Sequence, residues 1–237
     1  MRRLAAAIGW MLIFALLQGC GSQESGANDN RNGQGGLPMK YEEDLLQAVE
    51  RRDTTAVKKL LAEGAQVDAK DNKERTALMI ATYNNDVATA HVLIAEGADV
   101  NAQDDMLNSP FLYAGAEGYL DVLKLTIAAG ADPAVTNRYG GTALIPASEH
   151  GYVEVVRLLL TETTVDVNHV NRLGWTALLE AILLNDGGEK QQQTISLLIE
   201  HGADVNLPDA DGVSPLSHAR SRGFDAIVRQ LEQAGAK

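Results

Sequence analysis

Apolar residues recur in short blocks with helical spacing along most of this chain, and a glycine closes most of the blocks. Paired large apolar residues mark four of these blocks, at Leu60-Leu61, Leu93-Ile94, Leu158-Leu159 and Leu197-Leu198. The closing glycines are Gly64, Gly97, Gly130, Gly202 and Gly235, with steps of 33 residues from Gly64 to Gly130 and again from Gly202 to Gly235. Glycine adopts the left-handed conformation that ends many helices at little cost. The pattern therefore predicts a repeated helix that ends just before each glycine.

A second series marks the start of another helix in each unit. Its members are Thr76-Ala77-Leu78, Ser109-Pro110-Phe111, Thr142-Ala143-Leu144, Thr176-Ala177-Leu178 and Ser214-Pro215-Leu216. A Thr or Ser hydroxyl accepts a hydrogen bond from a backbone N–H group in the first turn of a helix, so this series predicts five N-caps. The apolar residue two positions later is expected to point into the core. The two phased series predict pairs of helices that stack on one another.

Together the two series resemble the repeat of the ankyrin family, roughly D-x-x-G-x-T-P-L-H-x-A followed by a second helix that ends in G-A-D-V-N. The resemblance covers about residues 40–237 and implies an all-α repeat solenoid, built from helix-turn-helix units joined by β-turns or hairpins. We expect a single domain over residues 39–237, with a cap at each end. Its six units span about 40–70, 71–103, 104–136, 137–170, 171–208 and 209–237.

Units four and five depart from the repeat. Unit four carries Pro146 inside its first helix, where we expect it to tighten or bend the first turns. It also has Thr161-Glu162-Thr163-Thr164 where Gly-Ala belongs. Unit five holds five extra residues around 185–193, which predict a longer connection between its two helices. Insertions in repeats often carry binding, and a tolerated loop extension is the equal alternative.

The first 38 residues have a different character. Met1-Arg2-Arg3 is followed by an uncharged stretch from Leu4 to Leu17, too short to span a bilayer but suited to a signal peptide over residues 1–19. Leu17-Gln18-Gly19-Cys20 resembles the lipobox of bacterial lipoproteins, which implies lipidation of Cys20. Residues 20–38 are expected to form the lipidated cysteine and a flexible tether. An ordinary secretory signal with a chance cysteine is the alternative.

Composition and charge exclude several kinds of site. The 237 residues include 32 acidic residues, 20 basic residues and one cysteine, and the net charge is −12. A single cysteine excludes an intramolecular disulfide framework, and the acidic balance argues against binding to nucleic acid. Part of the acidic excess is expected to be structural, since eight aspartates fall on turn positions of the repeat. They are Asp68, Asp71, Asp99, Asp104, Asp132, Asp166, Asp204 and Asp209.

Nothing in the sequence points to catalysis. The five histidines do not form an H-E-x-x-H motif, and no phosphate-binding loop or nucleophile elbow is present. His150 beside Glu149 is the best acid–base pair, and we interpret it as a solvated surface pair. The sequence therefore predicts no cofactor, no metal site and no enzyme.

The resemblance implies a protein-binding surface, because ankyrin repeats bind partners through turn tips and the concave face of their first helices. Carried over by position, the turn residues are Lys73, Arg75, Asp105, Asn108, Arg138, Tyr139, Arg172 and Trp175. The helix-face residues are Tyr83, Asn84, Glu117, Glu149, His150, Leu183, Leu184 and Arg222. Tyr83, Tyr139 and Trp175 are expected to form a stripe, with a structural role at the repeat junction as the alternative for Trp175. Tyr113 is expected to pack between helices.

We therefore expect a non-catalytic, protein-binding lipoprotein that is monomeric on its own. The location implied by the resemblance at Cys20 and Gly21 is the periplasmic side of the outer membrane. Two roles fit this expectation, an inhibitor or immunity protein and a protective assembly partner of an envelope enzyme. A structural envelope protein and an enzyme are the remaining alternatives.

The lipid anchor is tested by the variant Cys20→Ser. We expect a soluble or unprocessed protein, because acyl chains can no longer be attached and buried in the membrane. Membrane fractionation and immunoblotting measure the change, with Ser22→Ala as the matched control. Unchanged membrane association of Cys20→Ser would rule out the anchor.

Overall fold

The computed structural model describes residues 37–237, so the predicted signal peptide and Cys20 lie outside the described residues, as does the tether up to residue 36. Twelve helices occur in this part of the chain, as six antiparallel pairs. The pairs are α1 Leu37–Glu50 with α2 Thr54–Ala62, α3 Ala77–Tyr83 with α4 Val87–Ala95, α5 Pro110–Glu117 with α6 Leu120–Ala128, α7 Leu144–Glu149 with α8 Val153–Glu162, α9 Ala177–Leu183 with α10 Glu189–Glu200, and α11 Pro215–Ser221 with α12 Asp225–Gln233.

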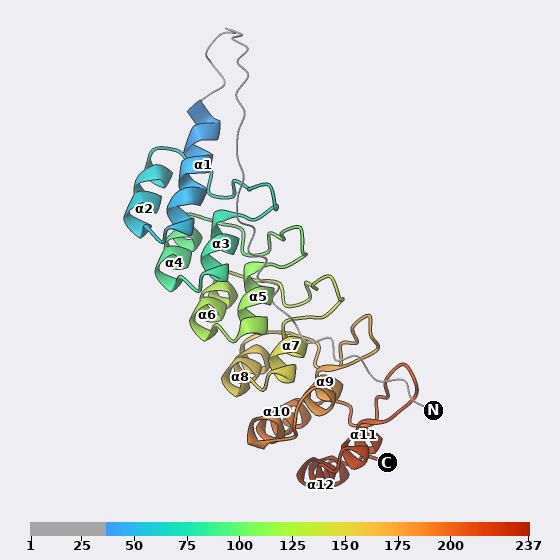
Figure 1. Cartoon of the computed structure of the whole chain (residues 1–237). Helices are drawn as coiled ribbons and strands as arrows, with labels where there is room; N and C mark the ends of the chain where they lie inside the picture. The colour runs from blue at the N-terminus through green and yellow to red at the C-terminus, as the bar shows by residue number, and fades with distance from the viewer. Residues whose placement is uncertain (1–36) are drawn as a thin grey trace, which may run out of the picture.

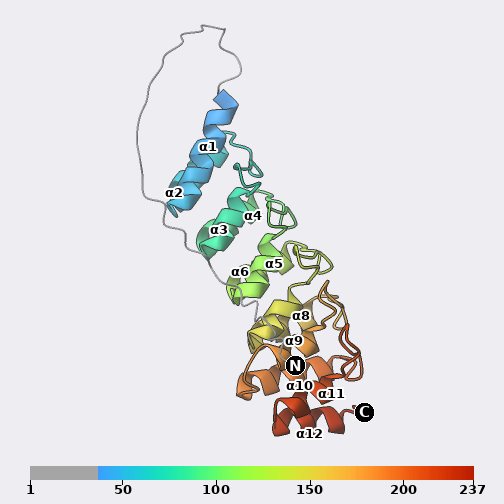
Figure 2. The same cartoon turned by 45° about the vertical axis from the view of Figure 1, so that its right-hand side comes forward.

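The pairs stack side by side into a solenoid, which confirms the predicted fold. Odd-numbered helices form one row and even-numbered helices a second row beside it, on the left in Figure 1. The loops between consecutive pairs project along one edge of the stack, beside the odd-numbered helices, and a second view shows the same edge (Figure 2). No helix in residues 37–237 is long and apolar enough to cross a bilayer. Helix α1 begins at Leu37, two residues before the expected start of the domain.

The predicted caps and core positions are present in most units. The hydroxyl groups of Thr76, Ser109, Thr176 and Ser214 accept hydrogen bonds from the backbone N–H three residues on, at 3.1–3.2 Å. Leu78, Phe111, Leu144, Leu178 and Leu216 are at most 2% exposed. The glycines that close the second helices have φ between 85° and 98°, as the helix-end prediction requires. Burial of these apolar side chains between neighbouring pairs is what stabilises a stack of units that cannot fold alone.

Unit four breaks the capping rule, and the predicted N-cap at Thr142 is wrong. Pro146 has no N–H to donate to the Thr142 carbonyl, so the N–H of Ile145 donates to it instead, at 3.2 Å. The helix starts one residue late and its first turn is tight. The Thr142 hydroxyl is buried and has no hydrogen-bond partner in the described chain. At the other end of this unit Thr163 replaces the glycine, and its hydroxyl donates to the Leu159 carbonyl at 2.6 Å.

The insertion in unit five is packed rather than looped out. The connection 184–188 is two residues longer than the connection 84–86, and α10 has 12 residues where α4 has 9. The prediction of a longer connection thus accounts for the smaller part of the insertion. Asn185 Nδ2 donates to the carbonyls of Ala181 and Glu149, at 2.8 and 3.3 Å. The Asn185 carbonyl accepts from Arg222. These bonds fasten the insertion to units four and six.

A ladder of side-chain hydrogen bonds links the turns of successive units. Asp68, Asn101, Asn168 and Asn206 each accept the backbone N–H of a residue in the next turn, namely Asp99, Asp132, Asp204 and Lys237, at 2.7–2.9 Å. Unit three has Ala134 at the corresponding position. Alanine offers no acceptor, so one rung of the ladder is missing there.

The packing of the insertion is tested at Gly187. Its φ is +70°, and an added Cβ would lie 2.7 Å from the Phe224 ring. We expect Gly187→Ala to lower the free energy of unfolding by about 3 kcal/mol, from backbone strain and overpacking together. Gly202→Ala is the matched control, because Gly202 has φ +91° with nothing within 4 Å. It should cost only about 1 kcal/mol in urea denaturation. Equal losses in the two variants would show that the insertion is loosely packed.

Candidate protein-interaction surface

Each projecting turn, or hairpin, is closed by the side chain of one Asp or Asn, which we call the Asx position. In unit two, Asp71 Oδ1 accepts hydrogen bonds from the backbone N–H groups of Lys73 and Arg75, at 2.8 and 2.9 Å. Asp104, Asn137, Asn171 and Asp209 make the same pair of bonds two and four residues on. The other aspartates predicted to be structural, Asp68, Asp99, Asp132, Asp166 and Asp204, also accept backbone hydrogen bonds, which confirms that prediction.

The second polar atom of the Asx side chain ties most hairpins to a neighbouring side chain. Asp104 Oδ2 accepts from the Tyr83 hydroxyl of α3 at 2.6 Å. Asn171 Nδ2 donates to Glu180 of α9 at 2.8 Å, and Asp209 Oδ2 lies 2.7 Å from His218 Nε2 of α11. The hairpins of units three, five and six are therefore held at fixed positions relative to the first helices.

Apolar side chains are exposed along the tips of the middle hairpins. Met106, Leu107, Val170 and Leu173 are 40–49% exposed, and in residues 40–237 all the exposed large apolar side chains lie in these hairpins. Between them the guanidinium of Arg138 lies 4.8 Å from the Tyr139 ring centroid. We call Met106, Leu107, Arg138, Tyr139, Arg172 and Leu173 the tip ridge. Such a contiguous set of apolar, aromatic and arginine side chains is typical of protein interfaces.

Three of the predicted contact residues are buried or half-buried. Asn108 is only 8% exposed, and its Nδ2 donates to the Tyr83 oxygen at 3.2 Å. Arg75 is half-buried and ion-paired with Asp71 and Glu50. Tyr83 is half-buried too, so these residues position the surface from within. Trp175 is half-buried, and its backbone N–H and carbonyl pair with Asn171.

Prediction from the sequence found Arg138, Tyr139 and Arg172 but missed Met106, Leu107 and Leu173. One hairpin position could have revealed these exposed apolar residues, because its residue type differs between units. The residue two after the Asx position is apolar or aromatic in units three to five, whereas it is Lys73 in unit two and Asp211 in unit six. Isolated apolar residues in turns are common enough that this contrast becomes informative only once the hairpins are aligned in space.

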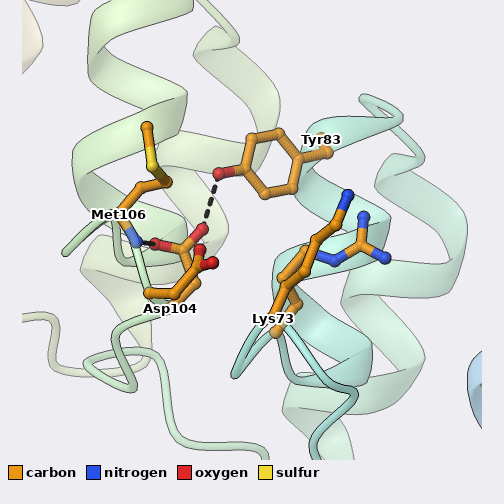
Figure 3. A pocket seen from close by; sticks show the side chains of 6 residues that line it. Lys73, Tyr83, Asp104 and Met106 are labelled. Atoms are coloured by element: carbon orange, nitrogen blue, oxygen red, sulfur yellow. Dashed lines mark hydrogen bonds between the residues drawn. The ribbon is translucent and has the colours of Figure 1, made fainter.

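A pocket of about 250 Å³ lies where the hairpins of units two and three meet, lined by Lys73, Arg75, Tyr83, Asp104, Asp105 and Met106 (Figure 3). The Tyr83 hydroxyl points to Asp104 in this view, and Lys73 lies on the opposite wall. Burial and the hydrogen bond to Asp104 raise the pKa of Tyr83 well above its usual value. Tyr83 thus remains a neutral hydrogen-bond donor at any physiological pH.

Aromatic side chains continue the surface along the first helices and at the starts of the second helices. The ring centroid of Tyr113 is 4.3 Å from that of Tyr83 and 6.1 Å from that of Tyr119. The expectation that Tyr113 packs between helices is confirmed. Glu117 is half-buried nearby, and His150 is exposed with its ring centroid 5.3 Å from that of Tyr152.

A buried carboxyl group that the repeat pattern did not predict underlies the helix face of unit five. Glu180 is only 5% exposed. Burial, with the negative charge of Glu149 as the second cause, raises its pKa to about 8. Burial also raises the pKa of Glu149, and the neighbouring His150 opposes that shift. In residues 37–237 no group of His, Cys, Asp and Glu side chains is placed to hold a metal ion.

The buried carboxyl makes stability depend on pH. Between pH 4.5, the usual pKa, and pH 8 the folded chain keeps a proton on Glu180 that the unfolded chain has lost. The free energy of unfolding should therefore fall as pH rises through this range. We expect Glu180→Gln to remove this part of the fall and to stabilise the protein at pH 8.5 by on the order of 2–4 kcal/mol. Denaturant titrations at pH 5, 7 and 8.5 measure it, with the exposed Glu154→Gln as control. A Glu180→Gln profile parallel to the unsubstituted one would disprove the shift.

Known proteins share both the sequence pattern and the fold. A family profile described as ankyrin repeats in three copies matches residues 5–104, 45–137 and 111–209. The ankyrin repeat protein YahD of Escherichia coli K12 is 55% identical over 78 residues, which are 33% of this chain and 39% of that protein. A mouse 2-5A-dependent ribonuclease is 36% identical over 73 residues, 31% of this chain and 10% of that protein. The chain thus aligns with well under half the length of these curated relatives.

Solved structures match over most of the chain. An ankyrin repeat domain from Acinetobacter baumannii is 52% identical with a TM-score of 0.81, covering 83% of this chain and all of that one. The ankyrin repeat domain of Bcl-3, described as a unique member of the IkappaB protein family, is 27% identical with a TM-score of 0.73, covering 86% of this chain and 89% of that one. Ankyrin repeats generally form non-catalytic scaffolds for protein–protein interaction. On the evidence of its profile matches, its relatives and its stacked helix pairs, this chain belongs to the ankyrin repeat family.

Proposed function

We propose that this protein is a lipid-anchored, non-catalytic binding protein of the bacterial envelope, which recognises one protein through its tip ridge and the adjoining helix face. The observation that carries the binding function is the exposed ridge itself, since its three large apolar side chains, Met106, Leu107 and Leu173, lie on hairpins whose positions are fixed by hydrogen bonds. Preorganised apolar and arginine side chains lower the entropy cost of association.

The proposed location rests on residues outside the described part of the chain. The uncharged stretch after Arg3, the lone Cys20 behind Gly19 and the polar run that follows all support an anchored protein. Residues 21–36 would give the solenoid a mean reach of roughly 20 Å from the membrane. A partner in the periplasm or on the membrane surface is consistent with that reach.

The proposal is tested by co-purification of the tagged, lipidated protein from detergent-solubilised envelopes, followed by mass spectrometry. A partner in near-equal amount would support it, and the identity of that partner would separate an inhibitor of an envelope enzyme from an assembly partner. If no other protein co-purified, from growing cells or from stressed cells, the result would count against binding and favour a structural role.

The binding surface is tested by the double variant Tyr139→Ala with Trp175→Ala. We expect affinity for the co-purified partner to fall by at least about 2 kcal/mol, because aromatic side chains dominate interface energetics. The melting temperature should change little, since both side chains are only half-buried.

The matched control is Lys124→Ala with Arg157→Ala, two exposed residues on the even-numbered helices. Titration by surface plasmon resonance compares the two double variants. An equal loss in both, or no loss in either, would place the interface elsewhere on the solenoid.

A further inference from the structure

The hairpins of units four and five differ in charge from the other hairpins. From Pro133 to Ser148, and again from Val167 to Leu179, the sequence contains no Asp or Glu, although the chain as a whole has 12 more acidic than basic residues. The hairpins of units two, three and six each carry at least two carboxylates. Arg138 and Arg172 occupy the two acid-free hairpins. The ridge is thus positive at its centre on an otherwise acidic protein.

The Asx positions follow the same division. They are Asp in units two, three and six but Asn in units four and five, the two units that carry arginine at the tip. Both residues close the hairpin with the same pair of hydrogen bonds to one oxygen. The turn therefore requires an acceptor and not a charge. Asn at these two positions keeps the hairpin closed without a carboxylate that would neutralise the neighbouring guanidinium.

Both guanidinium groups are held in place, yet neither is ion-paired within the described chain. Arg138 Nη2 donates to the Tyr139 hydroxyl at 2.9 Å and Nη1 contacts Met106 Sδ at 3.2 Å. Arg172 Nη1 donates to the Arg138 carbonyl across the gap between the hairpins, at 2.8 Å. A guanidinium has five N–H donors, so each arginine keeps donors for another molecule. In contrast, Arg75, Arg157 and Arg220 are each paired with a carboxylate.

Apolar side chains flank this positive centre on both sides. Met106 and Leu107 precede it at 40% and 42% exposure, and Leu173 follows it at 49%. An arginine guanidinium recognises a carboxylate through two parallel N–H donors, and apolar contacts around such an ion pair exclude water from it. Building on the proposed function, we infer that the tip ridge binds a protein segment in which an Asp or Glu carboxylate lies between apolar side chains.

The inference is tested with a defined probe, a displayed library of random twelve-residue peptides selected on the purified full-length lipoprotein in detergent. We expect enriched peptides to contain Asp or Glu flanked by Leu, Ile, Met or Phe. Peptides without an acidic residue, peptides rich in Lys and Arg, or the absence of enrichment would overturn the inference.

Substitutions at Arg138 and Arg172 test whether these two arginines bind the acidic residue of a selected peptide. Arg138→Gln with Arg172→Gln is expected to weaken a selected peptide at least tenfold. Asn137→Asp, which preserves the turn acceptor and adds a charge, should weaken it at least threefold. Replacing the acidic residue of the peptide by its amide should cost as much as the arginine variant, and the two losses should not add. Arg157→Gln is the control, and circular dichroism melting checks the fold. Retained binding in the arginine double variant would overturn the inference.

The same variants separate this inference from the proposed function. A co-purified partner that survives Arg138→Gln with Arg172→Gln but is lost with Tyr139→Ala and Trp175→Ala would leave the binding function intact and refute the acidic segment. Selected acidic peptides that depend on the arginine pair, together with a bait that captures nothing from envelopes, would support the ridge chemistry and refute the proposed role.

Discussion

The architecture of this protein depends on one hydrogen-bonding device, the Asx side chain that closes each hairpin by accepting two backbone N–H groups. The device leaves few turn amides unpaired at the exposed edge of the solenoid. Its second polar atom reaches the first helix in units five and six, and in unit three it reaches the helix of the preceding unit. Hairpin and helix thus become one rigid surface, and side chains at the tips are presented at a fixed spacing.

The core alone would leave that surface poorly defined. Stacked helix pairs bury Leu78, Phe111 and their counterparts, but burial of apolar area has no directional preference. The ladder from Asp68 to Lys237 supplies the directional element, because each rung joins a turn to the next turn at 2.7–2.9 Å. Apolar packing provides the stabilisation, while the polar ladder sets the register between units.

The fold could be predicted almost completely from the sequence, because the same capping, glycine and leucine positions recur in successive units. Caps, closing glycines and inward leucines follow from residue type and spacing alone. The cap at Thr142 could not, since it fails through an N–H that is missing four residues later, at Pro146. For the surface, arginine and tyrosine at the tips were predictable by position. The burial of Asn108 and Glu180 depends on neighbouring units, and a one-dimensional pattern does not report it.

The junction between units three and four lacks several hydrogen bonds that the other units repeat. Ala134, at the end of unit three, offers no acceptor to the next turn. In unit four the Thr142 hydroxyl is unpaired and Thr163 stands in place of the closing glycine. The buried apolar side chains nevertheless form one cluster from Phe111 to Leu231, through units three to six, and a second cluster from Leu45 to Val100, in units one and two. In a linear array each unit is held only by its neighbours, so the internal seam lies where these two clusters meet, between units two and three. Partial opening at this seam would divide the molecule into an N-terminal and a C-terminal part, each still stacked. Amide hydrogens on either side would then exchange as two separate groups, although they belong to one continuous domain.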